Sequence, residues 1–143
     1  MVEEEVIRNR LKYLDEYISD LEEERHLTWE EFLTSKKTRR YVERTLQLAV
    51  ECCLDIGHHI IAEERLREPA DNKDVFSVLH EAGFLRHPDV ARLRQMADFR
   101  NIVVYDYTRL DPALVFGILK NGTTDLADFS LDIKEAILGG KTG

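Results

Sequence analysis

The sequence predicts an all-α fold, an antiparallel four-helix-type bundle with additional short helices. Seven glycines and three prolines in 143 residues are too few for the many turns of an all-β protein. Apolar residues recur every three or four positions over long stretches, which is the period of an amphipathic helix. The length suits one domain, and no internal repeat or linker divides the chain. We therefore expect a single domain over residues 1–143, with residues 138–143 frayed.

Three helices are expected in the first half of the chain. Helical spacing of apolar residues predicts a first helix of roughly 20 residues. Thr28 followed by Glu31 matches a capping box, so a second, short helix is expected to start there. Residues 38–66 lack proline and carry two adjacent apolar stripes, which predicts a long central helix ended by Glu68-Pro69. The stripe of the first helix consists of Val6, Ile7, Leu11, Leu14, Ile18 and Leu21.

Capping residues divide the second half into further helices. Asn72 is expected to cap a short helix that Gly83 closes. His87-Pro88 and Asp111-Pro112 each offer a proline for the first position of a helix. Asn121-Gly122 predicts a kink or a break in the last helix.

The composition excludes several classes of protein. With 20 basic and 28 acidic residues, the net charge of −8 opposes broad, non-specific binding to nucleic acid. No apolar run approaches the roughly 20 residues that span a bilayer, and the acidic N-terminus is unlike a signal peptide. Cys52 and Cys53 are adjacent and lie in an apolar stretch, which favours two buried free thiols in a reducing cytoplasm.

The charge is unevenly distributed along the chain. Residues 34–44 carry a net charge of +4 and residues 86–110 one of +2, which leaves −14 for the remainder. Chance clustering on two solvated helix faces is one interpretation, and a local phosphate-binding surface is the other. The candidates for that surface are Lys36, Lys37, Arg39, Arg40, Arg92, Arg94 and Arg109.

The segment from Phe99 to Tyr107, followed by Asp111-Pro112, resembles the HepT-like proteins of the HEPN superfamily. These are small all-α toxins paired with a nucleotidyltransferase antitoxin. Their signature is Arg, a polar residue, three more residues, His, one residue and Tyr. Arg100, Asn101 and Tyr107 fit this signature in register. The resemblance covers about residues 3 to 135.

The resemblance implies a metal-independent endoribonuclease that acts on RNA, with Arg100, Asn101 and Tyr105 as its catalytic residues. Tyr105 stands where the family has its His. A tyrosine of pKa about 10 is a poor base near pH 7, whereas a histidine of pKa about 6.5 serves as base or acid. The alternative is therefore a catalytically weak or inactive protein that binds RNA, a nucleotide or the nucleotidyltransferase.

The resemblance also implies the partners. A homodimer would join two motifs in one cleft that binds the RNA substrate. The nucleotidyltransferase antitoxin would add AMP to Tyr107, the position of the family's motif tyrosine, and so silence the toxin. We expect no cofactor and no metal, because His59 and Glu63 form a pair of potential ligands without a clear third.

Overall fold

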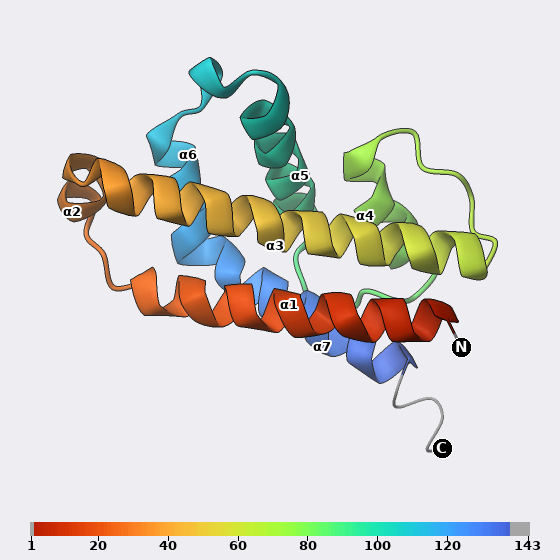
Figure 1. Cartoon of the computed structure of the whole chain (residues 1–143). Helices are drawn as coiled ribbons and strands as arrows, with labels where there is room; N and C mark the ends of the chain where they lie inside the picture. The colour runs from red at the N-terminus through yellow and green to blue at the C-terminus, as the bar shows by residue number, and fades with distance from the viewer. Residues whose placement is uncertain (1, 138–143) are drawn as a thin grey trace.

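Helices account for most of residues 2–137, the part of the chain that the computed structural model describes, and no strand occurs there (Figure 1). The predicted all-α bundle is confirmed, whereas the fraying expected for residues 138–143 lies outside the described residues. None of the described helices is both long and apolar enough to cross a membrane. The elements are α1 (Val2–Glu24), α2 (Trp29–Thr34), α3 (Lys36–Glu63), α4 (Asn72–Glu81), α5 (Val90–Tyr105), the 3-10 turn η1 (Tyr107–Arg109), α6 (Pro112–Gly117), the π turn η2 (Ile118–Gly122) and α7 (Thr123–Ile137).

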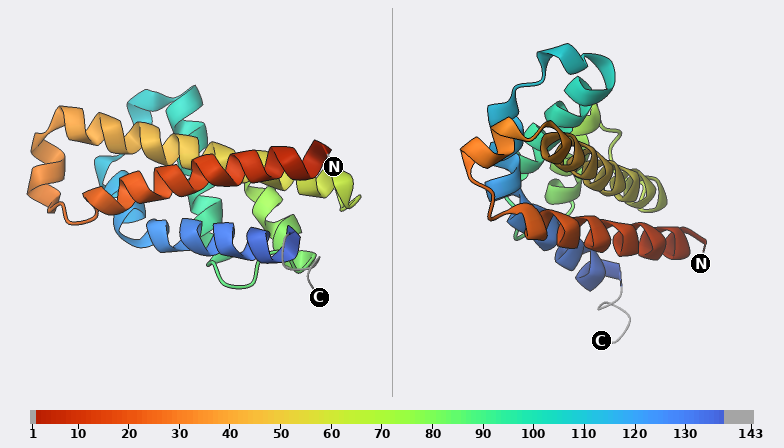
Figure 2. Two further views of the ribbon diagram at one scale, coloured as in Figure 1. Left: turned by 60° about the horizontal axis from the view of Figure 1, so that its bottom comes forward. Right: turned by 60° about the vertical axis from the view of Figure 1, so that its left-hand side comes forward.

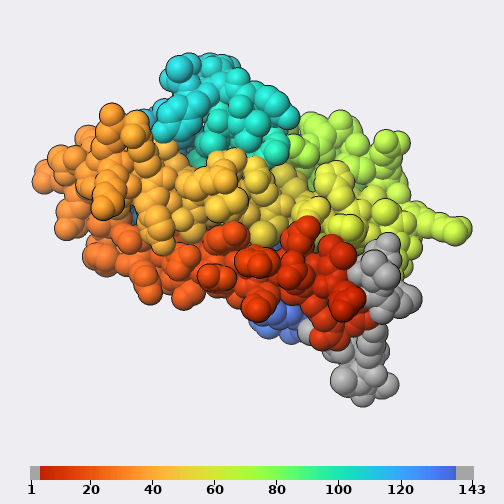
Figure 3. Space-filling view, in the orientation of Figure 1, coloured from red at the N-terminus to blue at the C-terminus, as the bar shows by residue number. Residues whose placement is uncertain are grey.

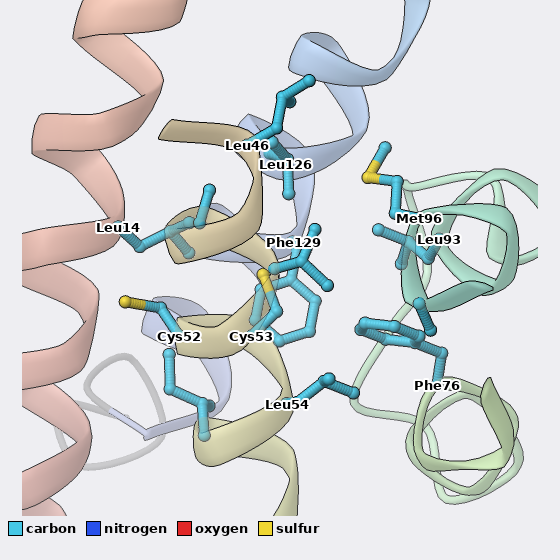
Figure 4. Close-up of a cluster of buried hydrophobic side chains, with 14 of the residues drawn as sticks. Leu14, Leu46, Cys52, Cys53, Leu54, Phe76, Leu93, Met96, Leu126 and Phe129 are labelled. Carbon is cyan, nitrogen blue, oxygen red and sulfur yellow. The ribbon is translucent and has the colours of Figure 1, made fainter. Parts of the chain in front are cut away.

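The long helix α3 is central to the bundle, as its wide apolar face predicts. It runs beside α1 and also contacts α4 and α5, while α7 packs against α1 (Figure 2). Phe129 of α7 and Cys53 of α3 belong to the same buried core, and the ring of Phe129 meets that of Phe76 edge to face at 6.0 Å (Figure 4). Cys52 and Cys53 are buried and free, as expected, and burial raises the pKa of Cys52 to about 11.

The end of α3 differs from the prediction. The helix stops at Glu63, well before Pro69. Arg65 adopts a left-handed conformation with φ of 53°, and the N–H of Leu66 donates to the carbonyl of Ile61 at 3.0 Å. This is a Schellman motif with arginine at the position that usually holds glycine. Backbone hydrogen bonding therefore ends the helix, and proline does not.

Two other helices start at aspartates rather than at the expected residues. Asp71, and not Asn72, caps α4 by accepting from the N–H of Asp74 at 2.9 Å. Asp89 caps α5, so Pro88 lies before the helix instead of at its first position. A carboxylate at the N-cap satisfies free N–H groups and also meets the positive end of the helix dipole.

The remaining predictions of helix ends are confirmed. Thr28 and Glu31 form the reciprocal capping box of α2, and Asp111 caps α6 with Pro112 at its first position. Gly83 closes α4 with φ of 88°. The break expected at Asn121-Gly122 takes the form of the π turn η2, which joins α6 to α7 without leaving the helical conformation.

Candidate functional site

The resemblance motif lies where α5 ends, and this part of the chain projects above α3 (Figures 1 and 3). Asp106 ends the helix with φ of −155° and ψ of 57°, while its N–H still donates to the carbonyl of Ile102 at 2.9 Å. The chain then forms the turn η1. This change of direction lets the hydroxyl of Tyr107 reach Glu43 of α3.

Arg100 is held by a carboxylate of α3. Its Nε donates to Oε2 of Glu51 at 3.3 Å, and its Nη1 donates to Oδ1 of Asn101 at 3.2 Å. Nε2 of Gln47, one turn earlier on α3, donates to the same carboxylate oxygen at 3.0 Å. The Arg100 side chain is only 20% exposed, and Nη2 makes no hydrogen bond to another residue between 2 and 137. The guanidinium is thus oriented by the protein and keeps a donor for a ligand.

Asn101 connects the motif to α4. Its Oδ1 also accepts from Nδ2 of Asn72 at 3.2 Å, so one oxygen joins Arg100 to the first residue of α4. Both contacts involve only the oxygen of the Asn101 amide. The NH2 group of Asn101 is left as a donor that could orient a phosphate or a ribose.

Tyr107 contacts a second carboxylate of α3. Its hydroxyl donates to Oε1 of Glu43 at 2.6 Å. This hydrogen bond raises the pKa of Tyr107, and burial raises it further, while Arg40 beside the phenol acts in the opposite direction. Glu43 is only 8% exposed, whereas Tyr107 is 49% exposed. One side of the phenol therefore faces solvent and the other a buried carboxylate.

Tyr105, the residue in place of the family's His, points into solvent. It is the last residue of α5 and is 77% exposed. Its hydroxyl makes no hydrogen bond within the described part of the chain. The exposed ring is free to stack on a base or to contact a second protein chain.

The basic candidates are spread over several places. Arg92 and Arg94 lie about two turns from Arg100 along α5, roughly 12 Å for Arg92 at 1.5 Å per residue. Arg92 binds buried Asp125 at 2.7 Å, and Arg94 donates to Ser77 Oγ at 2.7 Å. These two arginines have intramolecular roles that the sequence did not indicate.

The other basic candidates lie nearer to the start of α3 or to η1. Arg39 donates to the carbonyl of Leu33, while Lys36 and Lys37 are exposed. Arg109 is exposed and lies 3.5 Å from Asp106. Of all the basic candidates, Arg40 is the one beside Tyr107.

A hollow that the sequence did not predict lies next to Arg100. It is open to solvent, has a volume of about 540 Å³ and is lined by α1, α3, α5 and the start of α4, within the size range of small-ligand sites. No group of three or more potential metal ligands occurs among residues 2–137. The side chains that line the hollow include Arg10, Tyr13, Tyr17, Cys52, Asp55, His58, Asn72 and Arg100.

The two carboxylates of α3 were not predicted from the sequence either. Glu43, Gln47 and Glu51 follow one another at intervals of four on a helix whose neighbouring positions are apolar. Such a polar row inside an amphipathic pattern is the signal that could have found them. It predicts a polar strip along the helix, but it does not say which residues that strip contacts.

Known proteins resemble this chain in sequence and in fold. A family model described as ribonuclease HepT-like matches residues 14–133. The mRNA nuclease HepT of Shewanella oneidensis is 31% identical over 91 residues, which cover 64% of this chain and 68% of that protein. The tRNA nuclease HepT of Aphanizomenon flos-aquae is 25% identical over 115 residues, covering 80% and 78% respectively.

A solved complex extends the similarity to the whole fold. It contains a tri-AMPylated HEPN toxin of Shewanella oneidensis bound to an MNT antitoxin. The superposition has a TM-score of 0.78 at 26% identity and covers 90% of this chain and 96% of the solved one. The similar proteins thus include both ribonucleases and the modified toxin of a toxin–antitoxin complex.

Proposed function

Given that the chain belongs to the HepT-like ribonuclease family, we propose that it is the ribonuclease toxin of a toxin–antitoxin pair. It cleaves RNA in the cytoplasm without a metal and is silenced when a nucleotidyltransferase antitoxin adds AMP to Tyr107. The observation that carries the proposal is the anchoring of two motif residues to one helix. Arg100 binds Glu51 and Tyr107 binds Glu43, so both emerge beside α3.

Arg100, Asn101 and Tyr105 form the catalytic group in this proposal. Arg100, already oriented by Glu51, binds the scissile phosphate through its remaining donor, and the Asn101 amide orients the phosphate or the ribose. The 2′-OH of the RNA attacks the neighbouring phosphate. Tyr105 contributes a hydrogen bond or a proton and stacks on a base, because a phenol is a poor base near pH 7.

A homodimer completes the cleft. Two copies bring together two sets of motif residues and double a positive charge that is small in one chain of net charge −8. Arg40 lies beside Tyr107 and Arg109 follows it in η1, while Lys36, Lys37 and Arg39 lie in the first turn of α3 and would add positive charge on that side. Arg92 and Arg94 contribute less directly, because Asp125 and Ser77 already bind them.

A second function is favoured by Tyr105 itself. A protein with an exposed tyrosine in place of a general base would bind RNA or the nucleotidyltransferase without cleaving RNA. The two functions can be distinguished with the purified protein, because RNA binding and RNA cleavage are measured in independent assays.

The test compares the wild type with Tyr105→His and Arg100→Ala in RNA cleavage and RNA binding, with a chelator present. Arg8→Ala is the control, since it removes the same charge from α1, where Arg8 pairs with Glu4. Cleavage by the wild type that Arg100→Ala abolishes supports the ribonuclease. Cleavage by Tyr105→His alone supports the binding protein. If Arg100→Ala weakens RNA binding no more than the control Arg8→Ala does, both functions are refuted.

A further inference from the structure

The hydroxyl of Tyr107 already contacts a proton acceptor in the free chain. It lies 2.6 Å from Oε1 of Glu43, at the short end of the range required of a general base. Glu43 comes from α3, 64 positions earlier in the chain, and is buried against the core. The carboxylate is therefore held in place by packing, while the phenol remains accessible from its other side.

We propose that Glu43 is the general base for AMP transfer to Tyr107, so that this chain supplies the proton acceptor for its own silencing. The inference rests on the proposed function, because it concerns the modification step of that function. The nucleotidyltransferase then has to bring the nucleoside triphosphate and its metal ion, and the acceptor chain brings both nucleophile and base.

The reaction step balances with these groups alone. The Tyr107 oxygen forms a bond to the α-phosphorus of the triphosphate, and the bond from that phosphorus to the bridging oxygen of the β-phosphate breaks. Pyrophosphate leaves with the electron pair of the broken bond. The proton of the phenol moves to Oε1 of Glu43, across the hydrogen bond that the structure already contains.

Two features of the surroundings suit this role. The hydrogen bond to Glu43 and partial burial raise the pKa of Tyr107, so a free phenolate is scarce and attack has to be coupled to removal of the proton. Arg40 lies beside the phenol of Tyr107, and its positive charge attracts a triphosphate. Carboxylates take the proton of an attacking hydroxyl in the same way in protein kinases.

A purely positioning role for Glu43 makes a different prediction. Glutamine at this place still accepts a hydrogen bond from Tyr107 through its amide oxygen, but it does not take up a proton at neutral pH. The substitution Glu43→Gln therefore retains a partner for the phenol and removes only the base. Glu43→Asp retains a carboxylate as the base but places it one methylene farther from the Tyr107 hydroxyl.

The experiment follows AMP addition to the full-length chain by intact-mass spectrometry, with the nucleotidyltransferase partner, ATP and magnesium. Peptide mapping assigns the modified residue. For Glu43→Gln we expect a rate about 10²–10⁴-fold below that of the wild type at neutral pH. The rate of the variant should rise nearly tenfold per pH unit as the phenol ionises, whereas the wild type should change less. Glu63→Gln, the same exchange at the exposed far end of α3, should match the wild type.

Each alternative result has a distinct meaning. If Glu43→Gln keeps the wild-type rate, or loses rate with no recovery at high pH while Glu43→Asp is equally slow, the proposed base is wrong. If the wild type gains no AMP on Tyr107, the proposed function is itself refuted. Circular dichroism and a spectrophotometric titration of Tyr107, assigned with Tyr107→Phe, show whether Glu43→Gln is folded. In a folded variant the pKa of Tyr107 should fall, because the contact with Glu43 raises it.

Discussion

Replacing Asp132 with asparagine tests how the segment before α5 is attached to α7. Oδ2 of Asp132 accepts the backbone N–H groups of Arg86 and His87 at 2.7 and 2.9 Å, and Oδ1 lies 2.5 Å from Nδ1 of His87. The carboxylate is buried, while His87 is 55% exposed. This single side chain therefore joins two segments 45 residues apart.

The expected cost follows from the kind of hydrogen bond that is lost. Asparagine retains one oxygen for the backbone N–H groups but carries no charge. A hydrogen bond to a charged group is stronger than a neutral one by roughly 1 kcal/mol. Three such bonds, with the one to His87 discounted for its exposure, give a loss of about 2 kcal/mol in the free energy of unfolding. For a domain of this size that corresponds to a melting temperature lower by about 7 °C.

The assay is urea unfolding at pH 6, followed by circular dichroism, with Asp128→Asn as the control. Asp128 lies one turn earlier on α7 and lacks these contacts, so its substitution should change stability by less than about 0.5 kcal/mol. The midpoint for Asp132→Asn should fall while the slope of the transition stays constant. A cost for Asp132→Asn no larger than that for Asp128→Asn would refute the reasoning.

The pH dependence gives a second check on the same contact. Burial raises the pKa of Asp132, but the hydrogen bonds from Arg86 and His87 outweigh it and lower the pKa overall. The stability that Asp132 contributes is therefore present above its ordinary pKa of 3.8 and is lost as the pH falls through the lower folded value. The hydrogen bond to Asp132 raises the pKa of His87 above 6.5, so its contribution is complete below that pH and is lost as the pH rises through the folded pKa. The difference between wild type and Asp132→Asn should be largest between about pH 5 and 6.

Three further measurements test other parts of the structure. Arg65→Gly should raise the free energy of unfolding by about 0.5–1 kcal/mol, because glycine adopts the left-handed conformation without strain, whereas Arg65→Ala should bring no gain. Gly57→Ala should lower the free energy of unfolding by about 2 kcal/mol in denaturant titration, since the added Cβ would clash with Cγ1 of Val75. RNA binding, measured by fluorescence anisotropy, should weaken roughly 20-fold from about 50 to about 200 mM salt if about three phosphates are contacted. Equal stability of Arg65→Gly and Arg65→Ala would contradict the first prediction. An unchanged stability of Gly57→Ala would contradict the second, and RNA binding that does not depend on salt would contradict the third.

The helices were predictable because their signals are local. An apolar residue every three or four positions, the capping box at Thr28 and Glu31, and Pro112 after Asp111 each act within one or two turns. The errors occurred where two local signals compete. Asp71 and Asn72 are equally suited to cap α4, Asp89 caps α5 one residue after Pro88, and the backbone at Arg65 ends α3 before Pro69 is reached.

The candidate site was only half predictable. Arg100, Asn101 and Tyr107 were identifiable because they form one short motif. Their partners Glu51 and Glu43 were not, because these residues lie 49 and 64 positions away and nothing in the motif indicates them. The opposite holds for Arg92, whose charge is visible in the sequence while its contact with buried Asp125 is not.

What the sequence determined by itself is therefore the set of helices and the motif at the end of α5. What only the tertiary structure decided is the chemical environment of each motif residue: a carboxylate for Arg100, a carboxylate for Tyr107 and solvent for Tyr105. The physical reason is that helix periodicity depends on near neighbours, whereas the rotation and depth at which α5 meets α3 follow from how the whole core packs. That packing turns a row of polar residues on α3 into partners for a motif far along the chain.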